Sequence, residues 1–171
     1  MKKWLLVIVT MLPLSALANG FVGIDFVSSK VEPRSSNNDA SPQAMQFKMG
    51  HWFNREQTFG AEGRIGLGLN DSRLQGNTKL EINRTYGAFV RGQFPNTVMV
   101  RPYALLGVNR IETTIKSDGG RSSDNMSDLA LGFGADIDIS PVIFASVEYL
   151  RAVERSNRRV SNLSFGINGR F

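Results

Sequence analysis

Residues that could carry out chemistry are few in this chain of 171 residues. It has no cysteine and one histidine, His51, so it offers neither a thiolate metal cluster nor a histidine-based zinc centre. A hydrolytic base also needs a nucleophile within hydrogen-bond reach, yet Phe53, not serine, stands two residues after His51. We expect no catalytic residue and no cofactor.

Two further motifs resemble ligand sites but are better explained by strands. Asp128, Asp136 and Asp138 fall on one expected strand, not in the compact loop that calcium requires. The stretch GRIGLGLN at 63–70 resembles a phosphate loop but lacks the helix that must follow it. We therefore predict no metal site, and we assign the acids to ion pairs and the glycines to a crowded face.

The first 18 residues have the pattern of a secretory signal peptide. Lys2 and Lys3 precede an apolar run over 4–14, and Ala-Leu-Ala at 16–18 supplies the small residues of a cleavage site. A membrane anchor would need about 20 apolar residues. We expect one domain over 19–171. The chain has 20 Lys and Arg against 15 Asp and Glu, a net charge of +5, and loss of Lys2 and Lys3 lowers it to +3. This charge does not indicate a nucleic-acid partner.

Period-two alternation recurs through the rest of the chain and predicts eight strands. Short turns near 54–57, 95–97 and 140–141 alternate with longer polar loops near 29–43, 70–79, 112–127 and 152–159. Short turns at one end and long loops at the other are typical of a transmembrane barrel. The expected strands are 20–28, 44–53, 58–69, 80–94, 98–111, 128–139, 142–151 and 160–171.

The two faces of these strands differ in kind. One is apolar, whereas the other combines charged residues with many glycines. Strand glycines cost stability on a solvated surface but suit the narrow lumen of an eight-stranded barrel, where buried charges must be paired. The candidates for lumen ion pairs are Glu62, Glu81, Asp136 and Glu148 with Arg64, Arg91, Arg101 and Arg170.

Some choices stay open at this stage. In the strand over 98–111, the preferred phase places Val100, Ala104, Leu106 and Val108 on the apolar face and Arg101 opposite; a shift by one residue would exchange the faces. A soluble, lipocalin-like barrel with its apolar faces inside is the alternative to a membrane barrel. Which acid meets which base depends on the register.

Aromatic and basic residues gather near the expected strand ends. Aromatic girdles mark the two interfaces of a membrane barrel, and we expect His51 at the inner one. The girdle candidates are Trp52, Phe53, Tyr86, Phe94, Tyr103 and Tyr149. Arginine fits phosphate groups well, so the arginines near the external ends are candidates for lipopolysaccharide contact, with a solvated surface as the alternative: Arg84, Arg110, Arg151, Arg155, Arg158 and Arg159.

The end of the chain is its most specific signal. Leu163, Phe165, Ile167 and the terminal Phe171 lie at alternate positions of the last strand. Together with the leader, the eight amphipathic strands, RPYALLGVN at 101–109 and the final SFGINGRF, this strand resembles the OmpA-like outer-membrane β-barrel superfamily, which includes OmpX/Ail-type, porin-family and opacity-type surface proteins. The resemblance covers essentially all of 19–171. It implies the outer membrane of a Gram-negative bacterium and a terminal signal read by the barrel assembly machinery.

We therefore expect a monomeric, eight-stranded antiparallel transmembrane β-barrel that is not an enzyme. Side chains are expected to plug its lumen, and its four external loops to contact lipopolysaccharide, host molecules or neighbouring cells. A narrow channel for ions or small solutes is the alternative. A lipid-modifying enzyme is a third hypothesis, for which the sequence offers no Ser–His–acid cluster.

Overall fold

The computed structural model describes residues 19–33, 42–69, 72–73, 79–95, 99–117, 120–152 and 158–171. The expected signal peptide over 1–18 lies outside these residues. No helix in the described part of the chain is long and apolar enough to cross a membrane.

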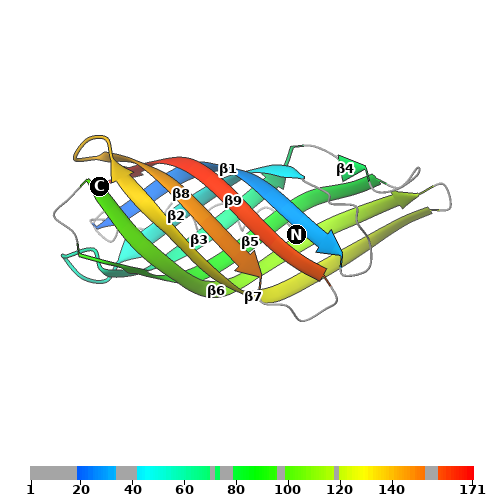
Figure 1. Cartoon of the computed structure of the whole chain (residues 1–171), viewed down its shortest axis with the longest axis horizontal. Coiled ribbons are helices and arrows are strands. Elements are labelled where there is room, and N and C mark those ends of the chain that lie inside the picture. Colours follow the sequence, from blue (N-terminus) through cyan, green and yellow to red (C-terminus); the bar gives the residue numbers. More distant parts are fainter. Residues whose placement is uncertain are drawn as a thin grey trace, which may run out of the picture.

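Eight antiparallel strands close into a barrel (Figure 1). β1 pairs with both β2 and β9, and β3 pairs with β5, so the ring has no open edge within the barrel. Closure of this kind is what a bilayer demands, because unpaired backbone groups in lipid are costly. The strands are β1 (Gly20–Pro33), β2 (Gln43–Trp52), β3 (Phe59–Gly68), the short β4 (Ser72–Arg73) beside β5 (Lys79–Gln93), β6 (Val100–Ser117), β7 (Gly120–Asp138), β8 (Ile143–Ala152) and β9 (Arg158–Arg170).

The apolar face of each strand points out of the barrel. On β2, Phe47 and Met49 are 51% and 55% exposed, whereas Lys48 between them is 3% exposed. On β6, Leu106 is exposed and Leu105 is buried, so the preferred phase of this strand is confirmed. The charged face lines the interior, and the soluble alternative with apolar faces inside is wrong.

The outer apolar belt on β9 spans enough residues to cross a bilayer core. On β9, Leu163, Phe165, Ile167 and Phe171 all lie on the outer face, 43–57% exposed. The stretch they cover matches the roughly 9–11 residues that a tilted strand needs to cross a membrane. At its end Phe171 exchanges backbone hydrogen bonds with Gly20 of β1, so the chain terminus is held in the wall of the barrel.

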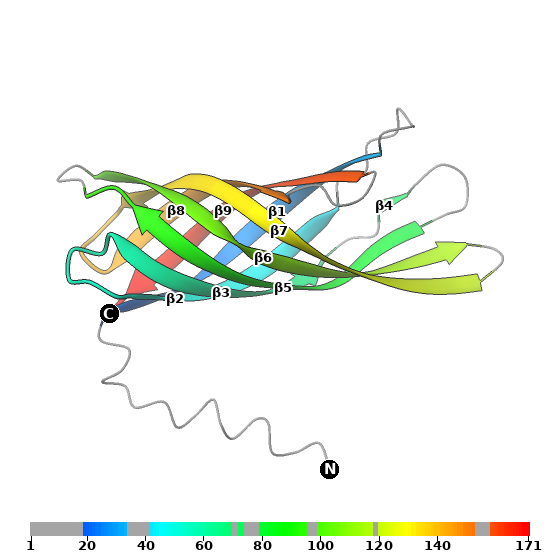
Figure 2. The ribbon, with the colours of Figure 1, turned by 90° about the horizontal axis from the view of Figure 1, so that it is seen from below.

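The hairpin of β6 and β7 is longer than the sequence pattern predicts. The pattern indicates a loop over 112–127, but β6 continues to Ser117 and β7 begins at Gly120, with the two residues paired. β8 joins β7 only from Ala130 onward, and the hairpin extends past the ends of β1 and β9 (Figures 1 and 2). Its polar sequence resembles a loop because no face there is apolar, yet backbone pairing still forms a ladder.

The other differences are smaller. β1 runs to Pro33, into the expected loop at 29–43, and β4 lies within the expected loop at 70–79. In β5 the register with β6 shifts between Ile82 and Arg84. Such a bulge interrupts the alternation of faces at this point of β5.

Candidate functional site: the charged interior of the barrel

Arg64 stands at the centre of the interior and binds two carboxylates. Its Nε donates to Glu62 Oε1 at 2.7 Å on the same strand, β3. Its two terminal nitrogens donate to Glu148 of β8 in a bidentate pair of 2.5 and 2.8 Å. All three residues are at most 4% exposed. Because β3 and β8 are not neighbours in the barrel, this pair crosses the lumen.

Arg91 of β5 extends this pair into a chain of charges. Its Nη2 donates to Asp136 Oδ2 at 2.5 Å, and its Nη1 lies 3.4 Å from Glu62 Oε2. At the other end of the chain, the Tyr103 hydroxyl donates to Glu148 Oε2 at 2.8 Å. The order of charges is therefore Asp136, Arg91, Glu62, Arg64 and Glu148, and we call these five residues the ion-pair chain.

A second ion pair lies beside the chain. Lys48 Nζ is 2.8 Å from Asp25 Oδ1 and donates to Ser146 Oγ at 2.9 Å. Gly166 makes room for this pair, since a Cβ there would overlap the Asp25 carboxylate. Among the described residues, five buried side-chain oxygens lack a hydrogen bond: both of Asp25 and the Oδ1 atoms of Asp136, Asn162 and Asn168. The carboxylate of Asp25 is thus held by charge rather than by an aligned hydrogen bond.

Aromatic rings surround the guanidinium of Arg91. Its Cζ lies 3.6 Å from the ring centroid of Tyr103, 5.2 Å from that of Trp52 and 5.3 Å from that of Phe21. Trp52 and Tyr103 are 4% and 2% exposed, so their assignment to an outer girdle is wrong. The reason is phase: both share the inward parity of charged neighbours on their strands. Phe53, by contrast, is 59% exposed.

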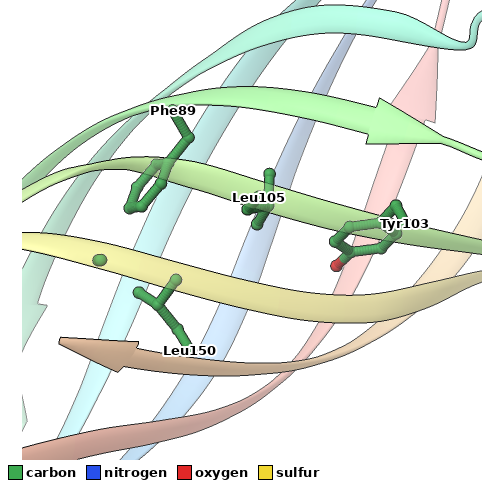
Figure 3. Packing of buried hydrophobic residues seen from close by; sticks show 5 residues of the cluster. Phe89, Tyr103, Leu105 and Leu150 are labelled. Atoms are coloured by element: carbon green, nitrogen blue, oxygen red, sulfur yellow. The ribbon is translucent and has the colours of Figure 1, made fainter. Parts of the chain in front are cut away.

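A cluster of apolar side chains packs inside the barrel next to the ion-pair chain. Phe89, Leu105, Ala130 and Leu150 are at most 5% exposed and pack with Tyr103 (Figure 3). The Arg64 guanidinium lies 4.6 Å from the Phe89 ring centroid. The ion-pair chain is therefore enclosed between rings and aliphatic side chains, where charge interactions are screened little by water.

The end of the barrel with the short turns carries two further arginines. Arg101 Nη2 donates to Asp138 Oδ1 at 2.6 Å, and Arg170 Nη2 binds the same oxygen. Arg101 Nη1 also donates to Gln57 Oε1 at 3.1 Å. Gln57 has a φ of 55°, a left-handed conformation that favours glycine. Gln57 thus keeps an unfavourable backbone conformation in its turn, and its side-chain amide oxygen accepts a hydrogen bond from an arginine at the barrel mouth.

The structure brings together five of the eight lumen candidates in the ion-pair chain and puts Arg101 and Arg170 at the mouth. The side chain of Glu81 lies outside the described residues. Asp138, one of the acids of β7 that the sequence assigns to ion pairs, pairs with both Arg101 and Arg170. Asp25 and Lys48 are not among the sequence candidates for lumen ion pairs, although they pair with each other. Nor did sequence reasoning single out Tyr103 and Phe89 as interior residues, which the alternation around them indicated.

The external arginines lie at the opposite end. Arg84, Arg110 and Arg151 are exposed. Arg110 Nε lies 4.0 Å from Glu112 Oε1, and Glu112 is also the cross-strand partner of Arg84. Arg155 and the side chains of Arg158 and Arg159 lie outside the described residues.

His51 has no polar partner at Nδ1 and packs against Phe53, with ring centroids 6.0 Å apart. Within the described ranges, no three His, Asp or Glu side chains come together as a metal site would require.

Comparison with known proteins supports the same architecture. The family model of the outer membrane protein β-barrel domain matches residues 4–171. Neisserial surface protein A is 18% identical, with a TM-score of 0.69 over 89% of this chain and 97% of that one. Ail of Yersinia pestis, solved in complex with the heparin analogue sucrose octasulfate, is 20% identical, with a TM-score of 0.68 over 89% and 97%. OprG of Pseudomonas aeruginosa is 12% identical, with a TM-score of 0.59 over 90% and 96%. No curated protein sequence matches.

Proposed function

The chain belongs to the outer membrane protein β-barrel family, and on that premise we propose that it is a structural and surface-interaction barrel whose lumen is closed by its own side chains. It is an integral protein of the outer membrane. Its fold suits surface interaction or a channel. Whether the barrel is a channel depends on whether its interior side chains block the passage of ions.

The observation that carries the proposal is the ion-pair chain. It crosses the lumen from β7 through β5 and β3 to β8, with N–O distances of 2.5–3.4 Å. Removing one partner of a buried pair leaves a charge without compensation, which costs about 3–5 kcal/mol. Ion pairs of this length support a lumen that resists opening, and on this proposal hydrated ions do not pass between the members of the chain.

Surface interaction is assigned to the external end. Arg84, Arg110 and Arg151 are exposed, and their guanidinium groups suit the phosphates of lipopolysaccharide. Charge-assisted bonds of this kind are strong and often bidentate. The complex of Ail with a polysulfated ligand shows that one such barrel binds a polyanion. For this chain we propose lipopolysaccharide contact, and adhesion through the external loops, as the surface role.

A narrow channel for cations is the second candidate. The interior places four carboxylates, those of Asp25, Glu62, Asp136 and Glu148, against the three cations Lys48, Arg64 and Arg91. The one extra carboxylate at this depth and the acceptor oxygens without hydrogen bonds favour a small cation there, while Asp138 with Arg101 and Arg170 leaves the mouth one extra positive charge. This candidate predicts conductance through the unmodified protein.

We propose no enzymatic activity, a monomeric state, cleavage of residues 1–18 and assembly through the C-terminal signal of Leu163, Phe165, Ile167 and Phe171. The outward position of these four side chains supports the last proposal. For His51, the buried Nδ1 without a hydrogen bond is unlike a catalytic base, which another group must orient.

Ion flux tests the closed lumen. Vesicles that are loaded with KCl and contain the folded barrel should retain K⁺ as well as protein-free vesicles do. Vesicles with a wide porin of about 16 strands are the positive control for K⁺ loss. Rapid K⁺ loss through the unmodified barrel would favour the channel. For the surface role, replacing Arg84, Arg110 and Arg151 with Gln should weaken lipopolysaccharide binding and reduce its salt dependence. Unchanged binding would refute that role.

A further inference from the structure

Two grooves cross the outer wall of the barrel, on the face that meets lipid. The first has a volume of about 800 Å³ and crosses β8, β9, β1, β2, β3 and β5. The second, of about 720 Å³, lies beside it over β7, β8, β9, β1 and β2. The exposed residues of their linings are apolar, and Ile24 and Ile167 belong to both linings. These two residues form the ridge between the grooves.

The strand register gives the first groove its direction. One of its sides is a row of cross-strand partners that runs from Ile167 through Ile24, Phe47 and Ile65 to Tyr86. The groove begins at Ile143, where β8 leaves its short turn. It therefore climbs from the periplasmic end toward the cell surface. The next partner of Tyr86 along the row is Arg110.

The second groove climbs in the same way. It rises from Ile137 and Ala145 to Met45 of β2. The cross-strand partner of Met45 is Leu67, and that of Leu67 is Arg84. Each groove thus leads at its upper end to an exposed arginine.

Gly63 gives the first groove part of its floor. It lies on the outward face of β3, and a Cβ at this position would meet no atom within 4 Å. Packing within the barrel therefore does not require a glycine here, in contrast to Gly166, whose Cβ would overlap Asp25. Glycine weakens a strand and often marks a place where a ligand or another chain approaches closely. The open space above Gly63 favours such an approach.

We propose that the grooves hold acyl chains of a phosphorylated lipid of the outer leaflet, with its phosphate groups on Arg84 and Arg110. This rests on the proposed lipopolysaccharide contact and gives it a place: lipid A, with the sugar phosphates at the arginines and two chains descending the wall. Charge complementarity favours this occupant over an uncharged one. Glu112 stands between the arginines in the ladder and opposes the phosphate, so it limits the affinity.

Lipid binding to the folded full barrel in detergent tests this proposal, with native mass spectrometry to count bound diphosphorylated lipid A. Gly63→Leu should fill the groove and lower the affinity about tenfold, a loss of ~1.4 kcal/mol. Gly92→Leu is the matched control, because a Cβ at Gly92 would likewise meet no atom within 4 Å and Gly92 lies outside both groove linings. Glu112→Gln should tighten binding. Arg84→Gln with Arg110→Gln should weaken binding of lipid A about tenfold or more but leave its dephosphorylated form unaffected.

The outcomes separate the groove from the wider surface role. If the arginine variants lose affinity while Gly63→Leu and Gly92→Leu behave alike, the lipopolysaccharide contact stands and the acyl groove is refuted. If the arginine variants bind lipid A as tightly as the unmodified barrel does, both the lipopolysaccharide contact and the acyl groove are refuted. If Gly63→Leu instead abolishes a dimer of the barrel without changing lipid binding, the groove is an interface between copies and the lipid proposal is overturned.

Discussion

Replacement of Arg64 by Met tests the energetic role of the ion-pair chain. Arg64 donates three hydrogen bonds of 2.5–2.8 Å to Glu62 and Glu148. Met has a similar length but no charge, so the change leaves two buried carboxylates facing each other. Breaking a buried pair by removing one partner costs about 3–5 kcal/mol. We expect the free energy of unfolding to fall by that amount.

A double-mutant cycle separates pairing from packing. Glu148→Gln alone should cost less than Arg64→Met, because Arg64 keeps Glu62 and the Gln oxygen still accepts from Tyr103. The double variant should cost at least ~1 kcal/mol less than the sum of the single variants, as expected for residues in direct contact.

Denaturant unfolding from lipid vesicles provides the measurement. The fluorescence of Trp52, which is 4% exposed inside the barrel, reports the transition. Arg151→Met is the control, because Arg151 is exposed and surface changes of this kind usually stay within about 0.5 kcal/mol. If Arg64→Met matches this control, the ion-pair chain does not stabilise the barrel and our reasoning about its firmness is wrong.

Three further changes are expected to give distinct results. Gly166→Ala should lower unfolding stability by about 1–3 kcal/mol by overpacking, whereas Gly92→Ala, with open space around its Cβ, should raise it by about 0.4–1 kcal/mol; equal effects would contradict the assignment of inner and outer faces. Gln57→Gly should leave stability within ~1 kcal/mol, because relief of the left-handed backbone offsets the lost hydrogen bond to Arg101, while Gln57→Val should cost at least ~1 kcal/mol in the same unfolding assay. Phe171→Ser should slow assembly by the barrel machinery in membrane extracts more than it weakens the folded barrel, and normal assembly would argue against the terminal signal.

Alternation along the chain is sufficient to predict the barrel and the direction of most side chains. Lys48 between Phe47 and Met49 shows why. In a barrel wall with lipid outside and a polar interior, the two apolar side chains face lipid and the charged one faces the lumen. The same rule indicates that Trp52 and Tyr103 point inward, but their nearness to strand ends suggests a girdle instead. Where both faces are polar, as in residues 112–127, alternation carries no signal and does not reveal the strands.

The partners within the interior could not be read from the sequence. Arg64 and Glu148 are 84 residues apart on strands that are not neighbours, so their meeting depends on the stagger of every strand between them. A single bulge, such as that between Ile82 and Arg84, changes the phase of all residues beyond it. Composition predicts that lumen charges pair, whereas the choice of partners follows from barrel geometry.

Single-channel recording across a planar bilayer tests most directly whether the ion-pair chain closes the lumen. The unmodified barrel should show no conductance steps. Arg91→Ala should show cation-selective steps, because it removes the guanidinium that lies among three rings and between Glu62 and Asp136. Steps of equal size from both proteins would contradict this account and establish the barrel as a channel.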